Sequence, residues 1–302
     1  MTMVSTRTVP WMKLGQLVDE PMTAKEAAEL GGLNFEVQKR PIFFQANDGD
    51  SEMTAIPDRV AIVRQDTNQW LGIMAPNYQM LQYGEAFDFM DTVNPKYVAA
   101  GCLKDGKQGF MVVQTDMTMH VLGDDDPHEL YMILRTSHDG SRAVEVSLQA
   151  LRNRCMNQLA LQSFVSGVEN RWSVKHTSTM HGKLVEAHTA VTKMDAYART
   201  FEQNAEKLAE LPVTDGVAQH ILETVLPERP RRGEQIERII TSWHTSETVG
   251  FDHQGWGLLN AVSEYFDWGR AGGSPESRFV SAMQGQTYKT INSTAKQLLT
   301  LV

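Results

Sequence analysis

The sequence is poor in cysteine: only Cys102 and Cys155 occur in 302 residues. A disulfide framework is therefore excluded, and so few thiols fit a reducing cytoplasm. No group of cysteines and histidines has the spacing of a zinc site. The chain is long enough for one large domain or two modest ones, with a hydrophobic core.

Long apolar runs are also missing. No stretch approaches the roughly 18–20 apolar residues that span a bilayer. The opening MTMVSTRTVPWMKLG lacks the apolar region and cleavage site of a signal peptide. The hydrophobic content of 41% and the charged content of 22% are ordinary for a globular protein. We expect a soluble, cytoplasmic protein without a membrane partner.

Positive charge is scarce and unevenly placed. The net charge of −9 argues by itself against bulk binding of nucleic acid. The segment from Arg135 to Lys193, however, holds eight basic and four acidic residues. It carries +4, which leaves −13 for the rest of the chain. This basic segment is a candidate anion-binding surface, and an ordinary solvated patch is an equally simple interpretation.

The first half of the chain has the patterns of strands with two helices. A capping box at Thr23 and Glu26 predicts a helix over 23–30, and a second helix is expected over 83–90. A strand over 35–44 and three hairpins, with turns at 66–69, 104–107 and 138–140, complete this part. The last hairpin strand alternates apolar and polar residues over 144–149, which predicts one buried and one solvent-exposed face. A helix is expected from 151 to about 165.

The second half is mainly helical by pattern. An apolar seam at heptad spacing predicts one long helix over 181–211, and its members are Leu184, Ala187, Val191, Met194, Ala198, Phe201, Ala205 and Leu208. Because half of these are Ala or Met, a helix packed along its own domain is slightly favoured over a subunit contact. Further helices are expected over 234–245, 257–266 and 287–301. We predict an α+β fold: an antiparallel sheet of hairpins packed with helices over 1–180, and a helical region over 181–302 that packs on this core or mediates oligomerisation.

The strongest candidate site is the stretch 151–159. Arg152 and Arg154 fall in the first turn of the expected helix, where basic residues oppose the helix dipole. A helix N-terminus with free N–H groups and two guanidiniums would make a phosphate cradle. The alternative is that both arginines bond to neighbouring carboxylates.

A second candidate site follows at 171–178. At the period of a strand, one face presents Arg171, Ser173, Lys175 and Thr177. Cations and hydroxyls are the groups that usually contact phosphates. The other face presents Trp172 and His176. Trp172 would stack on a base if it were exposed, but a Trp beside Val is more often core, and His176 is expected to be structural.

Motifs for nucleotide or metal chemistry are weak. The stretch 101–108 is close to a P-loop, but Gln108 replaces the Ser or Thr that binds Mg²⁺, and its turn joins two strands. Asp124, Asp125 and Asp126 with His128 would hold a divalent ion, although such acidic loops are usually only solvated.

No catalytic constellation stands out. Cys155 with His138 or His176 would form a nucleophile pair, but its spacing from Leu151 and Leu159 predicts a buried thiol instead. The motifs GxSxG, HExxH and GxGxxG do not occur. We therefore predict a binding protein without cofactor or metal, not an enzyme.

Several sequence blocks carry a family resemblance. PDRVAIVRQD, NYQMLQYGEAFDFMD, LYMILRTSHDGSRAVEV, RNRCMNQL and RWSVKHTST resemble the phage/plasmid-like family built on a domain of unknown function of the DUF932 type. The most specific feature is R-x-x-C-x-N-x-L followed by a basic block, present here as Arg152, Cys155, Asn157 and Leu159 with Lys175-His176-Thr177. The resemblance implies a mobile-element protein in a bacterial host cell.

The expected topology is in turn similar to the core of phage single-strand annealing recombinases of the Red beta, RecT and Erf kind. That similarity implies an ATP-independent homo-oligomer, a ring or filament, that binds single-stranded DNA and anneals complementary strands. Arg152, Arg154, Arg171 and Lys175 would contact phosphates, and Arg135 and Arg142 would extend the groove. One alternative is a host-interaction or anti-defence protein with a host protein partner for its acidic surface. A further alternative is a metal-dependent nuclease that uses the loop 124–128.

Overall fold

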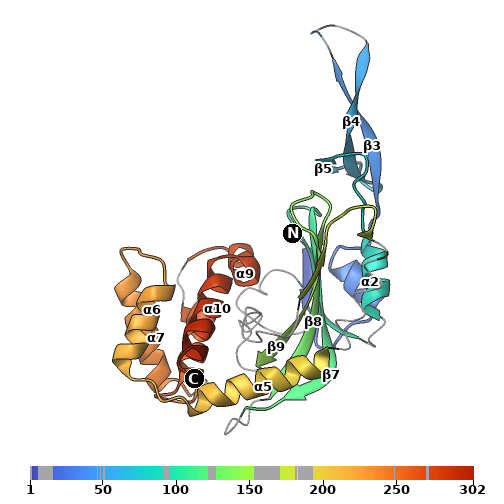
Figure 1. The fold of residues 1–302 in the computed structure, drawn as a ribbon. Coiled ribbons are helices and arrows are strands. Elements are labelled where there is room, and N and C mark those ends of the chain that lie inside the picture. Colours follow the sequence, from blue (N-terminus) through green and yellow to red (C-terminus); the bar gives the residue numbers. More distant parts are fainter. Residues whose placement is uncertain are drawn as a thin grey trace.

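The computed structural model describes residues 2–5, 16–45, 47, 49, 52–91, 95–121, 127–152, 171–180, 182, 193–247, 249–269 and 272–302. Two sheets dominate its N-terminal part and helices its C-terminal part (Figure 1), so the predicted α+β class is confirmed. None of the described helices combines the length and the apolar character that crossing a membrane requires. The predicted division after residue 180 falls between the last strand and the first long helix, and it stays a prediction.

The larger sheet has seven strands in the order β10-β9-β8-β7-β6-β1-β2. Their bounds are β1 Thr2–Ser5, β2 Gln16–Leu17, β6 Lys96–Leu103, β7 Gln108–Met119, β8 His128–Ser137, β9 Val144–Arg152 and β10 Arg171–Val174. All neighbours pair antiparallel except β1 and β2. The hairpins predicted about 104–107 and 138–140 are confirmed. Lys104, Asp105 and Gly106 turn the chain with positive φ values of 50°, 56° and 89°, a region in which Gly is unstrained.

The smaller sheet consists of β3 Val37–Gln45, β4 Met53–Arg64 and β5 Trp70–Met74. The hairpin predicted about 66–69 is confirmed, and β4 begins several residues earlier than the pattern indicated. β3 and β4 form a two-stranded ribbon that projects away from the rest of the molecule (Figure 1). Phe43, Phe44 and Met53 are exposed on this ribbon.

Two helices accompany the sheets, α1 Ala24–Leu30 and α2 Tyr83–Asp91. The predicted capping box of α1 is present: Thr23 Oγ1 accepts from the Glu26 N–H at 3.3 Å, and the Thr23 N–H donates to Glu26 Oε2 at 2.9 Å. From α2, Tyr83 reaches Gly109 of β7, where a Cβ atom would lie 2.4 Å from the tyrosine ring. The absence of a side chain at Gly109 therefore lets α2 pack directly on the sheet.

The helical region comprises α5 Met194–Glu210, α6 Asp215–Val225, α7 Arg232–Thr245, α8 Gly255–Glu264 with a π-helical extension η2 Tyr265–Gly269, α9 Pro275–Gln284 and α10 Gln286–Leu299. The helices predicted over 234–245, 257–266 and 287–301 are confirmed, whereas α6 and α9 were not predicted. Of the long helix expected over 181–211, the described residues form α5 from Met194 onward, and 183–192 lie outside the described residues. The seam residues Ala198, Phe201, Ala205 and Leu208 are buried within the chain's own core, so this part of the seam is not a free subunit contact.

The polar face predicted for β9 is not exposed to solvent. Glu145, Ser147 and Gln149 are all buried, as are Val144 and Val146 on the opposite face. The prediction of one exposed face was wrong because the sheet is covered on both sides. Tyr288 of α10 lies on the side of Glu145, where burial raises the pKa of its hydroxyl and nearby Arg171 and Arg135 lower it.

The turn between β8 and β9 buries a histidine. His138 is fully enclosed, with its ring 4.5 Å from that of Tyr83 and 6.2 Å from that of Phe35 between centroids. Within the described residues neither ring nitrogen has a hydrogen-bond partner. Burial, and to a smaller extent neighbouring His176, lower the pKa of His138 to about 3. His138 is therefore neutral in the folded protein at any pH above this value.

We expect His138 to make stability depend on pH. Between about pH 6.5 and pH 3 the unfolded chain binds a proton at His138 and the folded chain does not, so the free energy of unfolding falls as the pH falls. In that window His138→Phe should reduce the slope by up to ~1.4 kcal/mol per pH unit relative to wild type. Urea unfolding at several pH values measures this slope. His220→Gln, on an exposed face of α6, is the control and should leave the slope unchanged. Equal slopes in wild type and His138→Phe would contradict the assignment.

Candidate nucleic-acid interface

β10 is the edge strand of the larger sheet and carries the predicted alternation. It pairs antiparallel with β9, with Arg171 opposite Ser147 and Val174 opposite Val144. Arg171 and Ser173 are exposed, Trp172 is partly buried and Val174 is buried. Lys175 and Thr177 continue the exposed side beyond the strand. Arg171 and Ser173 therefore lie exposed on the edge strand, and Lys175 and Thr177 are exposed just beyond its end.

Three arginines meet at one carboxylate beside this edge. Arg171 Nη2 lies 2.8 Å and Arg135 Nη2 3.2 Å from Glu145 Oε1, and Arg142 Nη1 lies 3.1 Å from Glu145 Oε2. The side chains become more accessible from the inside outward, at 7% for Arg135, 14% for Arg142 and 47% for Arg171. We call these four residues the Glu145 cluster. Three guanidiniums and one carboxylate give them a net charge of +2.

The charges in the Glu145 cluster oppose one another. The pKa of Arg135 is lowered to about 10: burial lowers it most, Glu145 raises it, and Arg142 and Arg171 lower it. Arg135 still keeps its proton at neutral pH, so positive charge is held close to a poorly solvated surface. Charge interactions are stronger where water is excluded. An anion that approaches Arg171 is therefore attracted more strongly than it would be by a single, isolated arginine on the surface.

The sequence led us to expect Arg135 and Arg142 in an open groove, but their side chains are largely buried. Arg135 is directly opposite Glu145 across the β8–β9 ladder, and Arg142 precedes Glu145 by three residues. Both guanidiniums are turned inward because the carboxylate is buried, so they hold Glu145 and, through it, Arg171. The cross-strand pairing of Arg135 and Glu145 was readable from the hairpin register, and it is the clue that the sequence analysis missed.

The first predicted site does not begin as a helix. Leu151 and Arg152 are the last residues of β9, with Arg152 opposite His128. The expected helix start was wrong because the β8–β9 ladder continues through these positions. Arg152 lies five residues beyond Ser147, the partner of Arg171, or roughly 16 Å along the strand. The side chain of Arg152, together with Arg154 and Cys155, lies outside the described residues.

Trp172 and His176 both have partners inside the fold. Trp172 packs against the hydrophobic core, which leaves little of its face open for a base. His176 Nδ1 lies 2.8 Å from the Gln79 carbonyl oxygen and its ring stacks on Tyr78 at 4.8 Å between centroids. Burial lowers the pKa of His176, in keeping with the structural role predicted for it.

An exposed aromatic residue lies elsewhere, on β5. Trp70 is 58% exposed and Lys107 Nζ lies 4.6 Å from its ring centroid. Lys107 belongs to the β6–β7 turn, so a cation and an open aromatic face lie together beside the larger sheet. From the sequence, Trp70 was predicted only to begin a strand, and its exposure was not predicted. Its exposure follows from its place in the small sheet, which no local pattern reveals.

The histidine of the predicted divalent-ion loop lies in the core. His128 is fully buried, with its ring 5.3 Å from Phe201 and 5.7 Å from Trp256 between centroids. His128 is therefore not exposed to solvent, and residues 124–126 lie outside the described residues.

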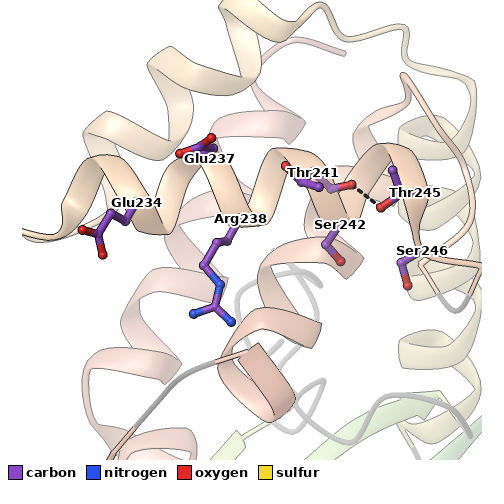
Figure 2. Close-up of a pocket in the computed structure, with 7 residues that line it drawn as sticks. All are labelled: Glu234, Glu237, Arg238, Thr241, Ser242, Thr245 and Ser246. Atoms are coloured by element: carbon purple, nitrogen blue, oxygen red, sulfur yellow. Dashed lines mark hydrogen bonds between the residues drawn. The ribbon is translucent and has the colours of Figure 1, made fainter.

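A polar hollow of about 610 Å³ runs along α7 (Figure 2). Three of its hydroxyl groups have partners: Thr245 Oγ1 donates to the Thr241 carbonyl at 2.7 Å, and Ser242 and Ser246 donate to Glu264 at 3.2 and 3.0 Å. The residues that line the hollow include no histidine or cysteine.

The fold and the site define an α+β protein with a basic sheet edge. The family described as domain of unknown function (DUF932) matches residues 70–298, and the chain belongs to this family. The comparison with curated proteins found no match, and neither did the comparison with solved structures.

We expect the Glu145 cluster to depend on its single carboxylate. Glu145→Gln leaves Arg135 buried without its counter-charge, and breaking a buried pair in this way costs roughly 3–5 kcal/mol. Chemical denaturation should show this loss in the free energy of unfolding. Glu223→Gln, on the exposed side of α6, should change it by less than about 0.5 kcal/mol. A Glu145→Gln protein as stable as the control would show that the arginines are balanced in another way.

Proposed function

We propose that this protein binds single-stranded DNA along the β10 edge and anneals complementary strands without ATP, acting as an oligomer. The supporting observation is Arg171: it is half-exposed and held by buried Glu145, and Lys175, just beyond the end of β10, is exposed as well. We also propose, from the family resemblance, that it serves a phage or plasmid in the cytoplasm of a bacterial host.

Arg171 suits a phosphate for two reasons. Its ion pair with Glu145 uses one nitrogen, Nη2, while a guanidinium offers five N–H donors. The same ion pair restricts the side chain before any ligand arrives, so less conformational entropy is lost on binding. Ser173 and Thr177 add hydroxyl donors on the same side. Such contacts position a nucleic-acid backbone without reading its sequence.

A strand of DNA with unpaired bases fits this surface better than a duplex. Single-strand binders combine a basic track for phosphates with aromatic faces on which bases stack. The exposed ring of Trp70 beside Lys107 supplies such a face, and it takes over the stacking role first considered for Trp172. Duplex DNA, with its bases already stacked, gains nothing from Trp70.

Independence of ATP is supported by the turn at 104–107. In a P-loop the glycine-rich turn leads from a strand into a helix, whose N-terminus binds phosphate. Here the turn joins β6 to β7 as a hairpin, and Tyr83 Oη donates to the Gly106 carbonyl at 3.2 Å. The turn therefore presents no helix N-terminus to a nucleotide.

Annealing requires many nucleotides held in register, so one protomer is insufficient. We propose that the β3–β4 ribbon contacts a second copy of this chain, because it projects from the body and exposes Phe43, Phe44 and Met53 (Figure 1). It replaces the helical seam in this role, since Ala198, Phe201, Ala205 and Leu208 are buried in the chain's own core.

The phosphate contacts can be counted from salt dependence. Affinity for a labelled single-stranded oligonucleotide should fall with salt by about 0.7 in log–log slope for each phosphate neutralised. Arg171→Ala with Lys175→Ala should weaken binding and reduce that slope by about 1.4. Lys25→Ala with Lys296→Ala removes the same charge from exposed positions on α1 and α10 and is the matched control. Arg152→Ala with Arg154→Ala tests the other predicted contacts. Binding that ignores salt, or that survives the Arg171 and Lys175 changes, rejects the proposal.

Annealing and assembly form a separate test. Two complementary labelled strands should pair faster with the protein than without it, in buffer free of ATP, and electron microscopy with oligonucleotide should show rings or filaments. Phe43→Ser with Phe44→Ser should abolish the assemblies and the acceleration while leaving single-site binding intact. Val217→Ser, which removes an exposed apolar residue of α6, is the control.

The two alternative functions have outcomes of their own. Degradation of the labelled strands in the presence of Mg²⁺ would identify a nuclease. A host protein that stays bound in a pull-down from host lysate after nuclease treatment would identify a host-interaction factor.

A further inference from the structure

Two histidines and an aspartate converge in the helical region, far from the β10 edge. Asp215 is the first residue of α6, His244 lies in the last turn of α7, and His253 lies in the loop between α7 and α8. One potential ligand atom from each lies within 4.8 Å of the others, and among the described residues this is the one such group. We propose that Asp215, His244 and His253 bind a divalent transition-metal ion, with Zn²⁺ as the best-matched ion.

The distances suit a small coordination sphere. His244 Nε2 lies 3.2 Å and His253 Nδ1 lies 3.9 Å from Asp215 Oδ1. A tetrahedral Zn²⁺ ion with bonds of about 2.0–2.1 Å separates its ligand atoms by roughly 3.4 Å. Small side-chain rotations therefore bring all three atoms to bonding distance of one ion. Two imidazoles and one carboxylate form a ligand set that Zn²⁺ accepts readily, and that Ca²⁺ and Mg²⁺, which prefer oxygen, do not.

The histidine at the centre is oriented by a second carboxylate. Asp252 Oδ1 lies 2.5 Å from His244 Nδ1. Metal-binding histidines usually donate their other ring N–H to a carboxylate, which fixes the tautomer. With its proton on Nδ1, His244 turns the lone pair of Nε2 toward Asp215 and His253. This contact is independent of the three ligand atoms and points to the same cation.

His244 Nε2 itself lacks a hydrogen bond. It is buried, and no hydrogen-bond partner lies in the described residues although Asp215 Oδ1 is 3.2 Å away. Two acceptors that face each other at this distance repel unless a positive charge lies between them. A metal ion beside both atoms supplies that charge and satisfies both of them.

The elements that carry the ligands are fixed to one another. The Val213 N–H donates to the His253 carbonyl at 2.9 Å, and the Gly255 N–H donates to the Leu211 carbonyl at 3.0 Å. Trp243, which is buried, stacks against the His244 ring at 4.7 Å between centroids. The two hydrogen bonds tie the segment before α6 to the loop that carries His253 and to the start of α8, and the Trp243 ring of α7 lies 5.8 Å from that of His253 between centroids. The site is therefore held together before an ion arrives, which lowers the entropic loss on binding.

With three protein ligands, a bound Zn²⁺ ion keeps a fourth position for water or a further ligand. The ion joins the start of α6, the end of α7 and the following loop, so its binding stabilises the helical region. It also neutralises the paired charges of Asp215 and Asp252. None of these residues belongs to the β10 edge or to the Glu145 cluster, so the inference stands apart from the proposed function.

The test uses the full-length protein stripped of metal by a chelator. Isothermal titration with ZnSO₄ should show one site per chain at micromolar or lower dissociation constant, and Co²⁺ should give the visible spectrum of a tetrahedral site. Asp215→Asn and His253→Asn should each weaken Zn²⁺ binding at least 100-fold, and Asp252→Asn about 10–100-fold. Zn²⁺ should raise the melting temperature of wild type and not that of His253→Asn. His220→Asn, on the exposed face of α6, is the matched control and should bind as wild type.

His253 is largely exposed, so its replacement should leave the fold intact, and circular dichroism verifies this. The proposal is overturned if no Zn²⁺ is bound at micromolar concentration. It is also overturned if Zn²⁺ binds but the Asp215 and His253 variants bind it as wild type does. Absence of Zn²⁺ binding together with an imidazolium at His244, detected by NMR at neutral pH, would assign the cluster to a structural ion-pair network.

Discussion

The ion pairs at Glu145 are the interaction on which the sheet and its edge depend. One buried carboxylate binds guanidiniums from β8, from the turn and from β10, so it joins three consecutive parts of the ladder through side chains as well as through the backbone. Without it, Arg135 would be a buried cation that the covered face of the sheet does not tolerate. With it, Arg171, the arginine nearest the solvent, is held by a carboxylate that Arg135 and Arg142 hold in place from the inside. The same ion pairs therefore stabilise the β8–β9–β10 ladder and fix the position of the positive charge at its edge.

Local sequence chemistry predicted the parts of the fold that local chemistry determines. The capping box at Thr23, the turns at 104–107 and 138–140 and the apolar period of α7 and α10 were all readable, because each depends on a few neighbouring residues. Burial of Glu145 was not, since it depends on residues distant in sequence, among them Tyr288 of α10. The start expected at Leu151 failed for a similar reason: pairing with β8 continues to Arg152, and ladder length is set by the partner strand.

The candidate sites also differ in whether neighbouring residues or distant ones determine them. Arg171 and Lys175 lie on one exposed side because a strand alternates, which the sequence reveals. The partnership of Arg135 with Glu145 required the hairpin register. The group at Asp215, His244 and His253 required the packing of α6 against α7, and α6 itself was not predicted. Metal ligands that come from separate helices have no spacing rule, so no sequence motif could have identified them. The arginines of the first site thus gather at the sheet edge, whereas the carboxylate and histidines of the second site lie among the helices.

The β3–β4 ribbon is anchored at its base in a way that couples it to the sheet edge. Strand β5, which pairs with β4, approaches the β8–β9 turn so closely that a Cβ atom on Gly72 would lie 2.8 Å from the Asp139 Cα atom, and one on Gly140 would lie 2.7 Å from the Met74 methyl group. That turn leads within a few residues to Arg142 and Glu145. The base of the ribbon and the arginines of the Glu145 cluster therefore meet at one turn. A displacement of β5 would press on the backbone of that turn, because no room for even one additional methyl group separates them.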